Sequence, residues 1–217
     1  MIYSQEIAEK TAKFLLQIKA IKLNNDEPFT WASGWKSPIY CDNRKTLSFP
    51  TVRTFLRQEM TRLVQEKFGD VEVVAGVATG GIALGVLVAQ ELGKPFVYVR
   101  AAGKKHGLEN KVEGVVAQGQ SVVVIEDLIS TGNSSLNAVK ALRSLGCNVK
   151  GMGAIFSYGF DLAEENFRKE KCTLYTLSAY GVLLQHASEQ GDITDEQLDS
   201  LALWRKNPEQ WGQKRRR

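Results

Sequence analysis

One segment of the chain combines residue types that could do chemistry. Residues 122–134 read VVVIEDLISTGNS: four apolar residues, the adjacent acids Glu126 and Asp127, then a turn rich in hydroxyls that contains Gly132. A continuous run of Val and Ile is typical of a strand buried on both faces. Two carboxylates add nothing to the stability of such a strand end, so we expect them to have a functional role.

The turn that follows the acids has the features of a phosphate site. Residues 130–134 (STGNS) lead into a predicted helix, whose first turn presents free N–H groups and the positive end of the helix dipole. Gly132 permits a tight turn, and the Ser and Thr hydroxyls add donors. The two carboxylates would repel a phosphate, so they suit another part of the same ligand. Ribose hydroxyls, a developing oxocarbenium ion or Mg²⁺ would fit them.

The segment therefore predicts a site for a ribose 5-phosphate. The alternative is that the turn only caps a helix and the acids are solvated. The strand, the acid pair and the S-T-G-x-S turn in one segment favour the ligand site. A Walker A phosphate loop is excluded because the chain contains no GxxxxGK[ST].

Alternating apolar runs and amphipathic stretches predict the elements that position this segment. We expect strands over 71–77, 96–100, 121–127, 148–158 and 172–177, and helices over 50–68, 82–92, 134–145, 161–169, 178–189 and 194–205. A first helix begins near Gln5 with Ser4 as its N-cap, and residues 27–43 form two short strands or a hairpin around Ser33 and Gly34. This order predicts an α/β fold whose mostly parallel sheet is flanked by helices, with the acids at a carboxyl strand end.

Length and composition favour one domain over 1–217. Its core would span about 46–177, and a small N-terminal hood would consist of about 1–45 together with the C-terminal helices. The net charge of +4 is mild, and much of the excess lies in residues 214–217, so we expect no nucleic-acid partner. No signal peptide or membrane span is expected. Three scattered cysteines without a CxxC motif favour reduced thiols and a cytoplasmic location.

Three motifs together resemble a known family. VVVIEDLISTGNS resembles the phosphoribosyl-diphosphate (PRPP) binding motif of type I phosphoribosyltransferases. EPFTWASGWKSPIYCDNR (27–44) and YVRAAGKKHG (98–107) resemble orotate phosphoribosyltransferases, and the similarity covers nearly the whole chain. The resemblance implies a type I phosphoribosyltransferase-like fold, and transfer of ribose 5-phosphate from PRPP to orotate. The products would be orotidine 5'-monophosphate, for pyrimidine (UMP) biosynthesis, and diphosphate. It also implies Mg²⁺ and a homodimer that shares its active sites.

The resemblance also assigns roles to single residues. Lys104, His106 and Asp127 are the implied catalytic residues, and Ser130 is an implied orotate contact. The implied PRPP-binding residues are Arg100, Lys104, Lys105, His106, Glu126, Asp127, Leu128, Ile129, Ser130, Thr131, Gly132, Asn133 and Ser134. No residue is a certain metal ligand: Mg²⁺ would be held mainly by PRPP, with Asp127 contributing through water.

Two loops complete the implied diphosphate site. Gly103 and Gly107 would let the loop over 101–113 open and close, although a solvated charged linker is an equal alternative when this loop is taken alone. Residues 78–81 (ATGG) match the diphosphate-binding loop of the family, although glycine-rich turns after strands are common.

The chain departs from the family where it would bind the base. Many members carry Lys at the positions of Ala32 and Ala101 and an Arg near 157–159, none of which is present here. Lys105 could partly replace the missing loop cation. Arg44 is the preferred partner for the orotate carboxylate, with Lys36 or backbone N–H groups as alternatives. A surface Arg44 in a salt bridge is equally compatible with the sequence.

Other interpretations and residues stay open at this stage. The chain could act on a purine or another base, could be a PRPP-sensing regulator, or could be a generic nucleotide-binding α/β protein. The hood motif and the loop Lys and His favour the orotate enzyme. Trp31 and Trp35 are expected in packing and His186 in a structural role, although Tyr40 or Trp35 could line the base pocket.

Overall fold

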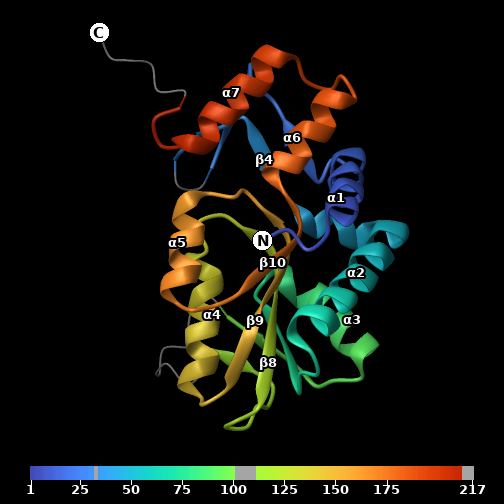
Figure 1. Cartoon of the computed structure of the whole chain (residues 1–217), viewed down its shortest axis with the longest axis vertical. Helices are drawn as coiled ribbons and strands as arrows, with labels where there is room; N and C mark the ends of the chain where they lie inside the picture. The colour runs from blue at the N-terminus through green and yellow to red at the C-terminus, as the bar shows by residue number, and fades with distance from the viewer. Residues whose placement is uncertain (32–33, 101–110, 212–217) are drawn as a thin grey trace.

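The computed structural model describes residues 1–31, 34–100 and 111–211, and its centre is a six-stranded sheet (Figure 1). The strand order is β10-β9-β8-β5-β6-β7. Five strands run parallel and the edge strand β7 is antiparallel. Their bounds are β5 (Val73–Val77), β6 (Phe96–Val99), β7 (Val112–Glu113), β8 (Ser121–Ile129), β9 (Asn148–Ser157) and β10 (Leu174–Ala179).

Helices cover both faces of this sheet. In Figure 1, α4 (Asn133–Ser144) and α5 (Asp161–Lys169) lie on one side. The opposite side carries α1 (Gln5–Gln17), α2 (Pro50–Phe68) and α3 (Gly80–Leu92). The central strands are buried along their length: β5 is buried throughout, and Val122 to Ile125 of β8 are fully inaccessible. Because these strands are buried on both faces, their sequences are continuous runs of apolar residues.

The hood lies beyond the carboxyl ends of the central strands (Figure 1). Two small antiparallel pairs form it, β1 (Ile21–Leu23) with β4 (Ile39–Cys41) and β2 (Phe29–Thr30) with β3 (Lys36–Ser37). The helices α6 (Tyr180–Glu189) and α7 (Asp195–Lys206) pack beside them. A 3₁₀ helix, η1 (Asn43–Ser48), then leads the chain from the hood back to α2 and the sheet.

The predicted elements are present, and the bounds of α2 and α5 match the prediction residue for residue. β8 is longer than predicted and runs to Ile129, because Leu128 and Ile129 still pair with Phe156 and Ser157 of β9. Three elements, β1, β7 and η1, were not predicted, since two or three extended residues and a 3₁₀ turn leave no periodic signal. Ser4 occupies the N-cap of α1 without a side-chain cap bond. Among the helices described, none combines the length and apolarity needed to cross a membrane.

An aromatic cluster joins the hood to the body of the molecule. Trp204 of α7 is 0% exposed and packs edge-on against Trp31, Tyr158 and Phe160, with ring centroids 5.5–5.8 Å apart. Its indole N–H donates to the Lys36 carbonyl of β3 at 3.2 Å. The tryptophans of the hood therefore serve packing, as the sequence analysis expected for Trp31.

We expect Trp204→Ala to lower the free energy of unfolding by about 3–5 kcal/mol, because it opens a cavity at the centre of this cluster. Urea unfolding followed by circular dichroism measures the change. Leu203→Ala is the matched control: Leu203 is the preceding residue of the same helix but is 63% exposed. Its substitution should change the stability by about 0.5 kcal/mol or less. Equal losses from both substitutions would contradict the role given to the cluster.

Candidate active site

A cleft of about 600 Å³ lies where the carboxyl ends of β5 and β8 meet the hood. This volume is within the range of small-molecule sites. It gathers three segments that are far apart in the sequence: the turn after β5, the end of β8 with the start of α4, and the chain between β4 and η1. Its lining residues are Cys41, Asp42, Arg44, Ala78, Thr79, Gly80, Glu126, Asp127, Leu128, Ser130, Thr131, Gly132, Asn133, Ser134 and Ser135.

The start of α4 forms one wall of the cleft. Gly132 is the N-cap with a φ of 78°, a conformation that favours glycine, and a Cβ there would lie 2.7 Å from the Phe167 ring. Because the N-cap has no side chain, the first-turn N–H groups receive no cap from it, and residues 132–135 of this turn line the cleft. Asn166 of α5 braces the turn through its amide, 3.0 Å from the Thr131 carbonyl and 3.2 Å from Asn133 Oδ1. This wall suits an anion.

The two acids differ in their surroundings. Glu126 is 5% exposed, and its oxygens accept from the Asp127 N–H at 3.0 Å and from the Ser135 hydroxyl at 2.8 Å. Burial, and next the negative charge of Asp127, hold the pKa of Glu126 well above its ordinary value. Asp127 is only half-buried and lines the cleft. Each Glu126 oxygen keeps a further lone pair, so both acids can accept bonds from ribose hydroxyls.

The turn after β5 packs directly on the acidic strand end. A Cβ at Gly80 would overlap the Asp127 carboxylate, and a Cβ at Gly81 would overlap the carbonyl oxygen of Ile125. The peptide bond between Ala78 and Thr79 is cis. Only glycine at 80 and 81 allows α3 to begin this close to β8. The two glycine-containing turns thus become two walls of one cleft.

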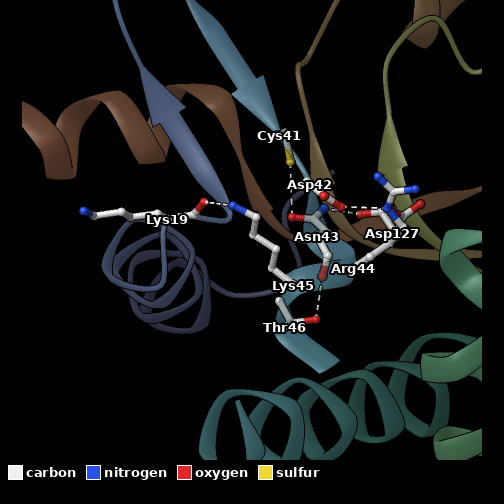
Figure 2. A network of polar contacts seen from close by, with 8 residues as sticks. All are labelled: Lys19, Cys41, Asp42, Asn43, Arg44, Lys45, Thr46 and Asp127. Carbon is white, nitrogen blue, oxygen red and sulfur yellow. Dashed lines mark hydrogen bonds and ion pairs between the residues drawn. The ribbon is translucent and has the colours of Figure 1, made fainter. Parts of the chain in front are cut away.

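The hood contributes a cation to the cleft. Arg44 lines it, is 60% exposed on its side chain, and pairs with Asp42 through Nε and Oδ1 at 2.7 Å. Its guanidinium extends toward Asp127 (Figure 2). The hydrogen bond with Asp42 raises the pKa of Arg44, with a smaller contribution from Asp127, and the same bond lowers the pKa of Asp42. Arg44 is therefore both salt-bridged and in the cleft, which combines the two sequence interpretations.

The structure brings together most of the predicted residues that it describes. The cleft is lined by Glu126, Asp127, Leu128, Ser130, Thr131, Gly132, Asn133, Ser134 and Arg44, together with residues 78–80 of the predicted turn over 78–81. The side chain of Ile129 is buried in the core, so only its backbone could contribute to a ligand site.

Three other basic residues that the sequence analysis weighed lie elsewhere. Arg100 pairs with Glu113 at 3.0 Å beside β7. The Lys36 ammonium donates to the Thr30 hydroxyl at 2.7 Å within the hood hairpin. His186 is half-buried near the end of α6. None of these three is among the residues that line the cleft.

The two aromatic candidates for the base pocket also lie in the hairpin region. Tyr40 packs on Phe29 with ring centroids 5.6 Å apart, and Trp35 stacks on Trp31 at 6.4 Å. Lys104, Lys105, His106, Gly103, Gly107, Ala101 and Ala32 lie outside the described residues, so their predicted roles stay predictions.

Sequence reasoning missed five residues that shape the site. Cys41, Asp42 and Ser135 line the cleft, Asn43 contacts Asp127, and Asn166 braces the turn before α4. Ser135 directly follows the recognised motif and could have been included with it. Asn43 and Cys41 lie in the recognised hood motif, but the contact of Asn43 with Asp127 spans 84 residues of sequence and has no local signal.

Comparison with known proteins places this fold and cleft in a class. Residues 54–173 match the model of the phosphoribosyl transferase domain, so the molecule is a phosphoribosyltransferase by family. A Phocaeicola vulgatus orotate phosphoribosyltransferase is 58% identical over 200 residues, 92% of this chain and 94% of that protein. The Porphyromonas gingivalis protein of the same name is 56% identical over 201 residues, 93% and 96% of the two chains. The chain belongs to the orotate phosphoribosyltransferase family.

A solved structure supports the same assignment. The crystal structure of orotate phosphoribosyltransferase from Aeropyrum pernix superposes with a TM-score of 0.73 at 28% identity. The match covers 84% of this chain and 99% of that one. The mostly parallel sheet flanked by helices is therefore the type I phosphoribosyltransferase fold, as the sequence analysis predicted.

The raised pKa of Glu126 predicts a pH-dependent effect of Glu126→Gln on stability. A group whose pKa is raised by folding stabilises the fold fully below its unfolded value of about 4.3 and loses this contribution as the pH rises through its folded value. The Gln side chain in Glu126→Gln has nearly the same shape as Glu126 and carries no charge at any pH. The melting temperature of Glu126→Gln minus that of the wild type should therefore increase from pH 5 to pH 8. The increase should be about 2–4 °C for each kcal/mol of unfolding free energy that the wild type loses over this range.

Glu72→Gln is the control with the opposite sign. Hydrogen bonds from the Ser121 backbone and side chain lower the pKa of Glu72, so its contribution is present at neutral pH and is lost as the pH falls. Glu72→Gln should destabilise the protein at pH 8 relative to the wild type. Parallel pH dependence of the two variants would contradict the assignment for Glu126.

Proposed function

We propose that this protein transfers ribose 5-phosphate from PRPP to orotate, giving orotidine 5'-monophosphate and diphosphate in pyrimidine biosynthesis. The observation that carries the proposal is the single cleft that joins the acid pair at the end of β8, the anion-binding start of α4 and Arg44 of the hood. Membership of the orotate phosphoribosyltransferase family supports the choice of base.

Each wall of the cleft matches one part of the substrates. The first turn of α4 binds the 5-phosphate, the carboxylate of Asp127 accepts bonds from the ribose hydroxyls, and Ser130 contacts orotate. Arg44 binds the orotate carboxylate, since a guanidinium forms paired bonds with a carboxylate. Its ion pair with Asp42 at the edge of the cleft supports this choice over Lys36, whose ammonium donates to Thr30 in the hairpin.

Catalysis depends on positioning of the two substrates and on electrostatic stabilisation of the transition state, without a protein nucleophile. A ring nitrogen of orotate forms a bond to ribose C1 and gives up its proton while the bond from C1 to the diphosphate oxygen breaks. The diphosphate keeps the electron pair of that bond, and the released proton balances the charge of the leaving diphosphate. Asp127 lies where positive charge develops on the ribose. Lys104 and His106, with Lys105, are proposed to meet the charge of the leaving diphosphate. Arg100, which pairs with Glu113, would join them only by leaving that pair. The turn over 78–80 faces the same group.

A divalent cation is proposed as the cofactor. Asp127 presents a carboxylate, the hard oxygen ligand that Mg²⁺ accepts directly or through water, and PRPP phosphates supply further oxygens. Bound there, Mg²⁺ would neutralise charge on the diphosphate. Turnover should therefore stop with excess EDTA and return with added Mg²⁺.

A homodimer in the cytoplasm completes the proposal. α3 presents an apolar surface on which Val86 is exposed and Ile82, Ala83 and Leu87 are half-buried, and such a surface supports association between subunits. All three cysteines are free thiols, which supports a reducing compartment.

An assay of orotate consumption with PRPP and Mg²⁺ tests the function, with adenine, hypoxanthine and uracil as parallel substrates. Turnover of orotate alone is the expected result. Turnover of another base would keep the PRPP site and overturn the assignment of the hood. Binding of PRPP without turnover of any base would indicate a regulator.

Gly80→Ala should lower kcat/KM for PRPP about 100-fold, because its Cβ would displace the Asp127 carboxylate from its place in the cleft. Steady-state kinetics give the change. Gly181→Ala is the matched control, since this helical glycine of α6 has open space around it. That variant should keep the activity and gain about 0.5–1 kcal/mol of stability. Normal kinetics of Gly80→Ala would contradict the proposed role of the close packing.

A shared active site predicts complementation between two inactive chains. Lys104→Ala and Asp127→Ala variants, each inactive alone, should regain activity when they are mixed and allowed to exchange subunits. Random exchange would restore one intact site in a mixed dimer. No recovery in a mixture whose subunit exchange is verified by mass spectrometry would show that each chain builds its own site.

A further inference from the structure

A continuous line of hydrogen bonds crosses the candidate site from the hood to α4. The Cys41 thiol donates to Asn43 Oδ1 at 3.2 Å, and Asn43 Nδ2 donates to the Asp127 carbonyl at 2.6 Å. The Asp127 N–H donates to Glu126, which also accepts from Ser135 in the first turn of α4. Figure 2 shows the hood half of this line, from Cys41 through Asn43 to Asp127.

The chemistry of its two ends fixes the orientation of the Asn43 amide. A backbone carbonyl can only accept, so the amide nitrogen must face Asp127. The thiol on the other side acts as a donor: burial raises the pKa of Cys41 well above its ordinary value, so it keeps its proton. Asn43 is 1% exposed, and its own carbonyl accepts from the Thr46 hydroxyl at 2.6 Å. The side chain therefore has one arrangement.

Both polar groups of the Asp127 backbone, its N–H and its carbonyl, form hydrogen bonds with side chains of this line. The Asp127 N–H donates to the Glu126 carboxylate, and the Asp127 carbonyl accepts from the Asn43 amide. These two bonds help to fix the orientation of the peptide units on either side of Asp127. The direction of a side chain follows from its backbone, and the Asp127 carboxylate has Gly80 against it. The pairing of β8 with β9 would remain without the Asn43 bond, but the Asp127 carbonyl would lose its side-chain partner and the carboxylate would shift within the cleft.

We infer that Asn43 is a positioning residue: by holding the Asp127 backbone it sets the ribose-binding carboxylate and ties the hood to the PRPP site. The inference rests on the proposed function. Asn43 itself does not line the cleft and acts through Asp127. Its amide is the one connection in this line that joins the segment before α2 to the end of β8.

The test compares Asn43→Asp with Asn43→Ala. The carboxylate has the shape of the amide but directs an oxygen instead of an N–H group at the Asp127 carbonyl, and the two would repel. We expect kcat/KM for PRPP to fall about 10- to 100-fold in Asn43→Asp and no further in Asn43→Ala. A role in packing alone gives the reverse order, because the isosteric variant would then be the milder one.

Thr46→Val is the matched control for loss of stability. It removes the hydroxyl bond to the Asn43 carbonyl, is equally buried and lies in the same 3₁₀ helix, but leaves the bond to Asp127. Kinetics and calorimetric titration of the free protein with PRPP are run at a temperature where unfolding curves show all variants folded. Thr46→Val should keep the wild-type affinity for PRPP, whereas both Asn43 variants should bind it about tenfold more weakly.

The outcomes separate this inference from the proposed function. Wild-type affinity for PRPP in Asn43→Asp, or an equal loss in Thr46→Val, overturns the positioning role while orotate turnover by the wild type still stands. If the wild type turns over no orotate, the proposed function fails. The positioning role is then decided by the PRPP titrations of the same variants.

Discussion

The arrangement of the site depends on how closely the first turn of α3 approaches β8. Two glycines in succession, Gly80 and Gly81, let the helix start against the Asp127 carboxylate and the Ile125 carbonyl. Any side chain at either position would separate β5 and its helix from the neighbouring strand. Because β5 and β8 are adjacent in the sheet, this contact brings their two following turns onto one cleft.

Around that contact, buried charge is matched with hydrogen bonds. Glu126 is the most buried acid of the cleft, and a carboxylate in this environment would be costly without partners. The Asp127 N–H and the Ser135 hydroxyl provide two. Asp127 and Arg44 remain accessible, and Asp42 balances the Arg44 cation. The cleft thus has a buried, hydrogen-bonded acid toward the sheet and an accessible ion pair toward the hood.

The sequence predicted those parts of the site that are local in the chain. The 122–134 motif contains a strand end, a turn and a helix start in one segment, so its geometry follows from chain continuity. Contacts between distant segments could not be predicted in this way. Lys36 and Arg44 are both basic and close in sequence, yet pairing of β2 with β3 places Lys36 opposite Thr30, while η1 carries Arg44 to the cleft. Ile129, at the end of the motif, faces the core because β8 continues past the acids.

The edge of the sheet at β10 has a different consequence. Residues 1–3 lie along this strand: the Tyr3 N–H donates to the Thr176 carbonyl, and the Thr176 N–H donates to the Met1 carbonyl. An uncovered edge offers unpaired backbone groups to any extended chain and promotes aggregation by strand addition. Here three residues occupy those groups. Loss of residues 1–3, or their displacement from β10, would therefore affect solubility before it affected chemistry.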